Sequence, residues 1–212
     1  EEFAMGLHLM GVKPKWDKGS ERVNGVEIIP ISELERPRLD VALRVSGLFR
    51  DVFPTLTAIF SQAVEALSNR DESLDWNPFV TQSSLARVFG PNPGSYGLAL
   101  GSLPEKFTKE AREEAGEAWL EGSSYSFNGD HVAYEPEAIA NIVQKADSFV
   151  HLQDLRETDL LLAADYANHV AGFSAAQSVT GGNAALYHLD NTLQQTPKAR
   201  SLREEIARVV QA

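Results

Sequence analysis

The clearest hydrophobic periodicity in the chain predicts a helix that starts near Pro54. Its apolar residues recur at the i, i+3, i+4, i+7 spacing of one helix face: Leu56, Ile59, Phe60, Ala63, Val64 and Leu67. Proline is tolerated in the first turn because that turn needs no N–H from it. Just upstream, residues 39–46 alternate between polar and apolar side chains and are rich in β-branched residues, as strands are. Gly47 permits a tight turn between them, so the three segments predict a βα unit.

Shorter patterns predict further elements in the first half of the chain. Residues 26–29 and 85–89 are apolar enough to form short strands, the second of them in the core. Residues 90–101 contain four glycines and two prolines, which favours an ordered loop entering a short helix.

The second half of the chain is predicted to be mainly helical. Residues 106–121 are strongly charged, with a narrow apolar stripe, and are expected to form a solvated surface helix that residues 122–129 break. Further helices are expected from Pro136 to about Ser148 and over residues 158–177, where a glycine pair ends the second one. A short strand over residues 185–189 precedes a capping box at residues 201–204.

Together these elements predict a mixed α/β fold rich in helix, with a parallel-type βα layer at the N-terminal end followed by a mainly helical region. Residues 1–6 are expected to be a vector-derived remnant, residues 7–105 the α/β region, and residues 106–212 a helix-rich region. The last predicted helix has an apolar stripe and no C-cap glycine, which indicates a fragment of a larger protein: Leu202, Ile206, Val209 and Val210.

Composition narrows the classes of function. A net charge of -11 argues against a nucleic-acid partner, because phosphate groups are bound by basic patches. The chain has no cysteine, which excludes disulfides, thiolate metal sites and cysteine nucleophiles. No stretch approaches the apolar run needed to cross a bilayer, so no membrane span is expected. The Gly-Lys-Ser/Thr ending of a nucleotide-binding loop is absent.

Several separated blocks, in this order, resemble the large subunits of cobaltochelatase and magnesium chelatase. The blocks in the first half are residues 11–14, 27–30, 36–41, 44–54, 86–91 and 94–97. Those in the second half resemble the cobalt branch of the family: residues 151–154, 157, 159–161, 165–166, 186–190 and 203–210. The resemblance runs from about Leu7 to the last residue.

The resemblance implies part of an ATP-dependent cobaltochelatase, a cytoplasmic enzyme of cobalamin biosynthesis. Such an enzyme inserts cobalt(II), its substrate ion, into a corrinoid precursor, hydrogenobyrinic acid a,c-diamide. ATP and magnesium would be bound by AAA+ motor and companion subunits and not by this chain, which is expected to be inactive alone. Two alternatives stay open. Either the region is only a scaffold that docks other parts of the complex, or the metal is magnesium and the ring a porphyrin.

Metal insertion needs ligands that hold the ion briefly and bases that accept the ring N–H protons. Imidazole and carboxylate groups suit both tasks for cobalt(II). We therefore expect His151, Glu157 and Asp159 to be catalytic, and metal ligands at four positions: His151, Asp154, His188 and Asp190. The plainer alternatives are that Asp159 complements a helix dipole and that His188 is a hydrogen-bonded core residue.

A corrinoid precursor also carries carboxylates, which arginine binds in a bidentate manner. Arg44, Arg50 and Arg87 lie in or just after predicted strands, where ligand sites of α/β layers form. Tyr96, in the glycine-rich loop, is expected to stack on the ring. The alternatives are a local ion pair, for example between Arg50 and Asp51, and a loop that only connects two elements.

Overall fold

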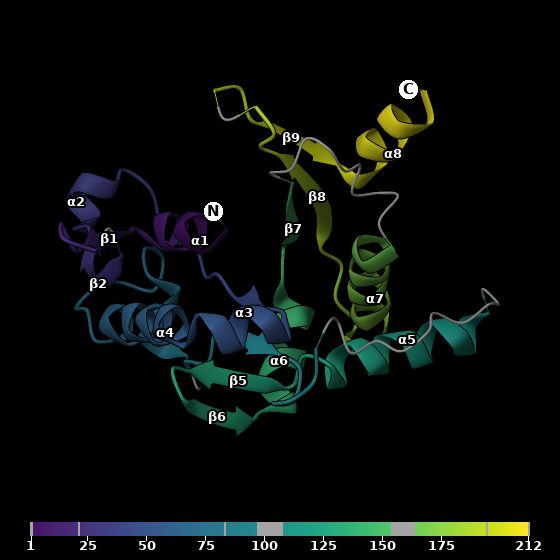
Figure 1. Ribbon diagram of the computed structural model, residues 1–212, viewed down its shortest axis with the longest axis horizontal. Helices are drawn as coiled ribbons and strands as arrows, with labels where there is room; N and C mark the ends of the chain where they lie inside the picture. The colour runs from purple at the N-terminus through teal and green to yellow at the C-terminus, as the bar shows by residue number, and fades with distance from the viewer. Residues whose placement is uncertain are drawn as a thin grey trace. The chain divides into compact units, whose positions relative to one another are not determined.

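A computed structural model of the 212-residue chain shows a mixed α/β fold, as the sequence predicts (Figure 1). Two compact units make up the fold: Glu1–Tyr96 with Ser123–Ala138, and Gly97–Gly122 with Ile139–Ala212. The structure describes residues 2–20, 22–82, 84–96, 108–153, 164–193 and 195–211. No helix within these ranges is long and apolar enough to cross a membrane.

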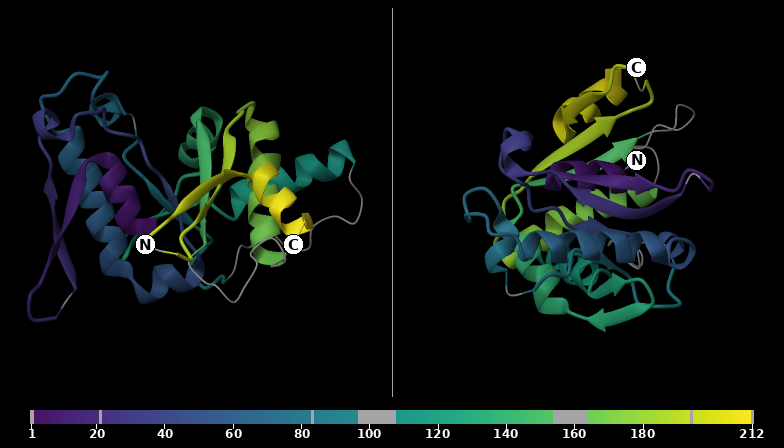
Figure 2. Two further views of the ribbon diagram at one scale, coloured as in Figure 1. Left: turned by 90° about the horizontal axis from the view of Figure 1, so that it is seen from above. Right: turned by 90° about the vertical axis from the view of Figure 1, so that its left-hand side faces the viewer.

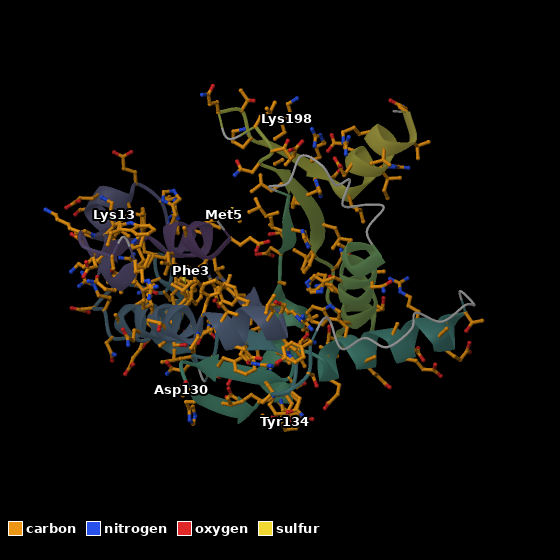
Figure 3. The ribbon with its side chains drawn as sticks, in the orientation of Figure 1. Phe3, Met5, Lys13, Asp130, Tyr134 and Lys198 are labelled. Atoms are coloured by element: carbon orange, nitrogen blue, oxygen red, sulfur yellow. The ribbon has the colours of Figure 1, made fainter. Side chains whose placement is uncertain are left out.

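A four-stranded sheet forms the centre of the first unit. Its order is β3 (Leu43–Arg44), β4 (Val88–Gly90), β5 (Tyr125–Asn128) and β6 (His131–Tyr134). β3 and β4 are parallel, which is the arrangement that the predicted βα unit requires, while the other pairs are antiparallel. The β5–β6 hairpin was not predicted, because the sequence of its first strand indicated only a helix break. Tyr134 and Asp130 lie along this hairpin (Figure 3).

The strand predicted over residues 39–46 is wrong for most of its length. Only Leu43 and Arg44 pair with a neighbouring strand. Upstream, the backbone N–H of Arg38 donates to the carbonyl of Trp76, and that of Leu39 donates to the carbonyl of Leu9. These donors are therefore already used outside the sheet, although the side-chain pattern resembles that of a strand.

The predicted helix, α4 (Pro54–Ser68), begins at the proline expected in its first turn, and a short helix that was not predicted, α3 (Gly47–Val52), precedes it. The side chain of Ser46 caps α3 by accepting the N–H of Phe49 at 3.1 Å. The predicted buried face of α4 is confirmed, with Leu56 only partly buried and Thr57 added to it. Four of these side chains join the core cluster of the unit with Val88 of β4 and Phe127 of β5: Phe60, Ala63, Val64 and Leu67.

Four short elements precede the sheet: α1 (Glu2–Met10), β1 (Val12–Trp16), β2 (Val23–Ile28) and α2 (Ile31–Leu34). β1 and β2 form an antiparallel hairpin at one end of the unit (Figure 2). The expected boundary before Leu7 falls inside α1. Phe3 of this helix packs against Phe60 of α4, with ring centroids 5.7 Å apart (Figure 3).

The second unit is built on a three-stranded sheet in the order β7 (Ser148–Gln153), β8 (Ala185–Asp190) and β9 (Lys198–Ser201). β7 and β8 are parallel, and the chain between them includes α7 (Ala164–Thr180), so the unit contains a βαβ arrangement that was not predicted. β7 was not predicted: it lies in the stretch between the two predicted helices, and α6 (Pro136–Lys145) ends three residues before the predicted helix end at about Ser148.

The last helix, α8 (Leu202–Gln211), begins with the predicted capping box. The carboxylate of Glu204 accepts the N–H of Ser201 at 2.7 Å, and the Ser201 hydroxyl accepts the N–H of Glu204 at 3.3 Å. The predicted apolar face is not buried within the described chain. Val210 is 81% exposed, and the buried residue of the helix is Glu205.

The helix predicted as a solvated surface element, α5 (Lys109–Glu121), instead packs closely against α7 (Figure 1). Its buried residues are Ala111, Gly116 and Trp119. A Cβ atom at Gly116 would lie 2.6 Å from the carbonyl oxygen of Ala175, so the two helix backbones approach where only glycine fits. Gly116 lets the helices approach closely and Trp119 packs against Phe173 of α7, so α5 is buried on one side although its apolar stripe is narrow.

Candidate functional site

One face of the β7–β8–β9 sheet carries three of the predicted site residues. In the register, His151 pairs with His188, and His188 pairs with Arg200 of β9. Asp190 pairs with Lys198, which is labelled in Figure 3 at the start of β9. Side chains of paired residues lie on the same face of a sheet. The fold thus brings His151, His188 and Asp190 together from segments far apart in the sequence.

His188 is fully buried in the second unit. Its Nε2 atom lies 3.6 Å from Oε1 of Glu205 on α8. Burial lowers the pKa of His188, and this effect outweighs the opposing attraction of Glu205 and Asp190. The imidazole is therefore neutral near pH 7, a state in which it can accept a proton or bind a metal ion.

Glu205 is a buried acid that was not among the predicted site residues. Arg200 Nη1 lies 3.0 Å from its Oε2 atom, and Arg208 Nη2 lies 2.6 Å from its Oε1 atom. Burial alone would raise its pKa, but hydrogen bonds from Arg208 and the positive charges of Arg208 and Arg200 hold the pKa below its usual range. No local signal indicated its burial, because the groups that contact it include His188 of β8 and Arg200 of β9.

Asp190 is engaged by its neighbours at the end of β8. Both Nη atoms of Arg200 lie 3.1 Å from its Oδ2 atom, and the Thr192 hydroxyl donates to its Oδ1 atom at 2.7 Å. Burial raises the pKa of Asp190, yet these hydrogen bonds and the Arg200 charge bring it below the ordinary value. The carboxylate is therefore ionised, and it orders the arginine that also binds Glu205.

His151 lies in the middle of β7 and is partly buried. Its Nδ1 atom is 3.1 Å from the carbonyl oxygen of Leu152. A carbonyl only accepts hydrogen bonds, so Nδ1 carries the hydrogen and the ring lone pair is on Nε2. Burial lowers the pKa of His151, the Leu152 hydrogen bond partly opposes this, and the nearby His188 lowers it slightly more. This is the tautomer in which Nε2 binds a metal or accepts a proton.

A third histidine, His169 of α7, lies with its ring beside that of His151 and was not among the predicted site residues. The two ring centroids are 6.1 Å apart with an interplanar angle of 74°. Trp119 of α5 donates its indole N–H to Nδ1 of His169 at 3.2 Å. No local pattern indicated this contact, because the partners are fifty residues apart in the chain.

The predicted arginine clamps lie in the first unit, where all three donate hydrogen bonds to protein groups. Arg87 is 3% exposed and makes a bidentate ion pair with Asp40, at 2.6 and 3.0 Å. Arg50 binds Asp51 at 2.7 Å, which is the local ion pair expected as an alternative, and donates to the carbonyl of Pro91 at 2.8 Å. These contacts favour a structural role for both arginines.

The other two predicted substrate contacts differ in exposure. Arg44 is mostly covered, its Nε donates to the Ser123 hydroxyl at 3.2 Å, and burial lowers its pKa to about 10. Tyr96 is 66% exposed at the end of the loop that Arg50 holds. A hydrogen bond to Tyr96, after the larger effects of Arg50, helps to lower the pKa of Asp51.

The remaining predicted ligands and bases, Asp154, Glu157 and Asp159, lie outside the described residues. Within the described ranges, no group of three or more histidine and carboxylate side chains is arranged to hold a metal ion. His151, His188 and Asp190 are thus the described part of the predicted metal site.

Comparison with known proteins identifies the family. The sequence profile of the CobN/Magnesium Chelatase family matches residues 1–212. The chain belongs to this family. Within the CobN/Magnesium Chelatase family, the aerobic cobaltochelatase subunit CobN of Pseudomonas aeruginosa is 36% identical over 100% of this chain. A magnesium-chelatase subunit of Rhodobacter capsulatus is 25% identical over 97% of the chain.

A solved structure of the same family has a similar fold. The catalytic subunit of cobaltochelatase from Mycobacterium tuberculosis superposes with a TM-score of 0.86, at 27% identity, over 98% of this chain. The chain spans only 19% of the length of that subunit and 19% of the Pseudomonas protein.

Proposed function

We propose that the chain is part of the tetrapyrrole-binding large subunit of an ATP-dependent cobaltochelatase. The complete subunit would insert cobalt(II), as substrate ion, into hydrogenobyrinic acid a,c-diamide in cobalamin biosynthesis. ATP would be hydrolysed in the cytoplasm by AAA+ motor and companion subunits. The chain alone would bind the metal ion without catalysing its insertion, because it spans only about a fifth of the length of its relatives.

The observation that carries the proposal is the pairing of His151 with His188 on one sheet face. Both imidazoles have lowered pKa values, so both are neutral near pH 7. Neutral imidazole is a good ligand for cobalt(II), and two such ligands bind weakly enough to release the ion. The same groups accept protons, which metal insertion must remove from the ring nitrogens.

The predicted acids have separate roles in this proposal. In sequence, Asp154, Glu157 and Asp159 follow β7 directly, and we assign Asp154 to the metal and the other two to proton removal. Asp190 orders Arg200, which in turn binds Glu205 behind His188. Such partners commonly fix the orientation of a histidine ligand.

Two observations support cobalt over magnesium. The cobaltochelatase relative is 36% identical to this chain, against 25% for the magnesium-chelatase relative. Magnesium also prefers oxygen ligands and keeps several of its waters, whereas imidazole binds cobalt(II) well. The two histidines therefore fit the cobalt reaction better.

For the tetrapyrrole, we propose that Tyr96 stacks on the ring and that Arg44 helps to bind its carboxylates. Arg50 acts indirectly, because it holds the carbonyls of Pro91 and Asn92 in the loop before Tyr96. Arg87 supports the same unit through its ion pair with Asp40.

Calorimetric titration with cobalt(II) tests the proposal. We expect His151→Ala to weaken binding at least tenfold, about 1.4 kcal/mol. His131→Ala is the matched control, since His131 is exposed on β6 of the first unit. Equal affinity of the two variants, or no binding by the folded chain, would contradict the proposal and favour a docking role. A second titration with hydrogenobyrinic acid a,c-diamide then tests the ring contacts.

A further inference from the structure

A buried hydrogen bond joins Trp119 of α5 to His169 of α7. The indole N–H of Trp119 donates to Nδ1 of His169 at 3.2 Å, and the rings stack with centroids 5.7 Å apart. Trp119 is 2% exposed and His169 is 8% exposed. Because the indole N–H can only donate, Nδ1 of His169 is the acceptor and the hydrogen of the neutral ring is on Nε2. The bond therefore selects one tautomer and one ring orientation.

Two phenylalanines restrict the His169 ring further. Phe149 of β7 meets it edge to face, with centroids 5.3 Å apart. Phe149 also stacks on Phe173 of α7 at 4.4 Å, and Phe173 meets the edge of Trp119 at 5.5 Å. Edge-to-face and offset arrangements are the favourable geometries of aromatic rings. His169 is thus held by rings from α5, β7 and α7.

The restricted His169 ring lies against His151. Their rings meet edge to face at 6.1 Å, and His151 follows Phe149 by two residues on the same side of β7. On the strand side, His151 pairs with His188. The imidazole of His151 is therefore held between a neighbouring strand and a fixed ring on α7.

We propose that Trp119 and His169 are positioning residues for His151. The Trp119 hydrogen bond orients His169, and the His169 ring holds the His151 imidazole in the orientation that presents Nε2 to cobalt. This inference rests on the proposed function of His151 as ligand or base. A positioning role would account for the buried tryptophan in α5, a helix that otherwise carries many charged residues.

Two kinds of variant separate the hydrogen bond from the packing. Trp119→Phe keeps an aromatic ring and removes the donor. His169→Asn keeps an acceptor near the Nδ1 position, whereas His169→Leu removes it and keeps the bulk. Trp76→Phe, in the first unit, is the control for loss of an indole. Folding of each variant is checked by its circular dichroism and amide spectrum.

Nitrogen NMR of the 212-residue chain labelled in histidine reports the tautomer of His169 and the environment of His151. In Trp119→Phe we expect mixed His169 tautomers, shifted His151 signals and three- to tenfold weaker binding of cobalt(II) alone. His169→Asn should bind cobalt(II) more tightly than His169→Leu. Wild-type tautomer and signals in Trp119→Phe, or unchanged cobalt affinity, would overturn the inference. If His151→Ala binds cobalt(II) normally, the proposed function fails. The His169 tautomer and the His151 signals in Trp119→Phe then decide alone whether Trp119 and His169 position His151.

Discussion

Replacing Gly116 by alanine tests the packing that places α5 against α7. The added methyl group would lie 2.6 Å from the oxygen and 2.7 Å from the carbon of the Ala175 carbonyl, and 2.8 Å from a methyl group of Val179. Unstrained carbon contacts are about 3.5–4.0 Å. Two of the three atoms belong to the backbone of α7, so a side-chain rotation cannot relieve the overlap. The helices must move apart.

Two opposing effects determine the free-energy change. Alanine in a helix interior is favoured over glycine by about 1 kcal/mol. Overpacking a tight contact costs about 1–3 kcal/mol, and a backbone obstacle places this site at the upper end of that range. We therefore expect Gly116→Ala to lower the free energy of unfolding by about 1–2 kcal/mol, against the usual trend of glycine-to-alanine changes in helices.

Urea denaturation followed by Trp119 fluorescence measures this effect, because Trp119 lies three residues further along α5. Gly25→Ala in β2 is the control, since no atom lies within 4 Å of a Cβ built at that position. It should change the free energy of unfolding by less than about 0.5 kcal/mol. A Gly116→Ala protein that is as stable as the wild type, or more stable, would refute the close approach of the helices.

Two further predictions concern ionisable side chains that are buried or partly buried. Replacing Arg87 by methionine should lower the free energy of unfolding by about 2–4 kcal/mol in urea denaturation, because the ion pair with Asp40 and two carbonyl contacts are lost; an unchanged midpoint would contradict this. The free energy of unfolding should also fall as the pH decreases below about 6.5, since burial lowers the pKa of His151 and His188 and the unfolded chain takes up protons first. Stability that is flat or rises between pH 7 and 5.5 would contradict this sign.

Local patterns predicted the parts of the fold that depend on neighbouring residues. The buried face of α4, the capping box of α8 and the strand β8 were each encoded within a few turns or residues. The parallel pairing of β3 and β4 also followed, because a βα unit returns the chain to the same sheet. These elements were sufficient to predict a mixed α/β fold.

Elements that depend on distant contacts were missed. β7 lies between two predicted helices, and so short an apolar run has too few residues for its periodicity to identify a strand. α5 is buried because Gly116 and Trp119 contact α7. The many charged residues of α5 instead predicted a helix exposed to solvent. Gly116 was the available signal, since glycine in a helix interior is costly unless close packing requires it.

The same limit applies to the candidate site. The sequence identified His151 and His188 through a family resemblance and their chemistry, and their strand pairing brings them together. Glu205 and His169 were missed because their partners come from other elements, as in the contacts of Glu205 with His188 and of His169 with Trp119. Burial of a charged or polar group depends on those partners, which a single sequence does not reveal.

The proposed cobalt site on the β7–β8 face is tested through the paramagnetism of cobalt(II), which broadens and shifts the NMR signals of nearby nuclei. Amide spectra of the ¹⁵N-labelled chain would be recorded as cobalt(II) is added. We expect signals around His151 in β7 and His188 in β8 to be affected first, while those of β3–β6 keep their intensity. Broadening centred in the first unit, or none at all in the folded chain, would contradict a cobalt site on this sheet face.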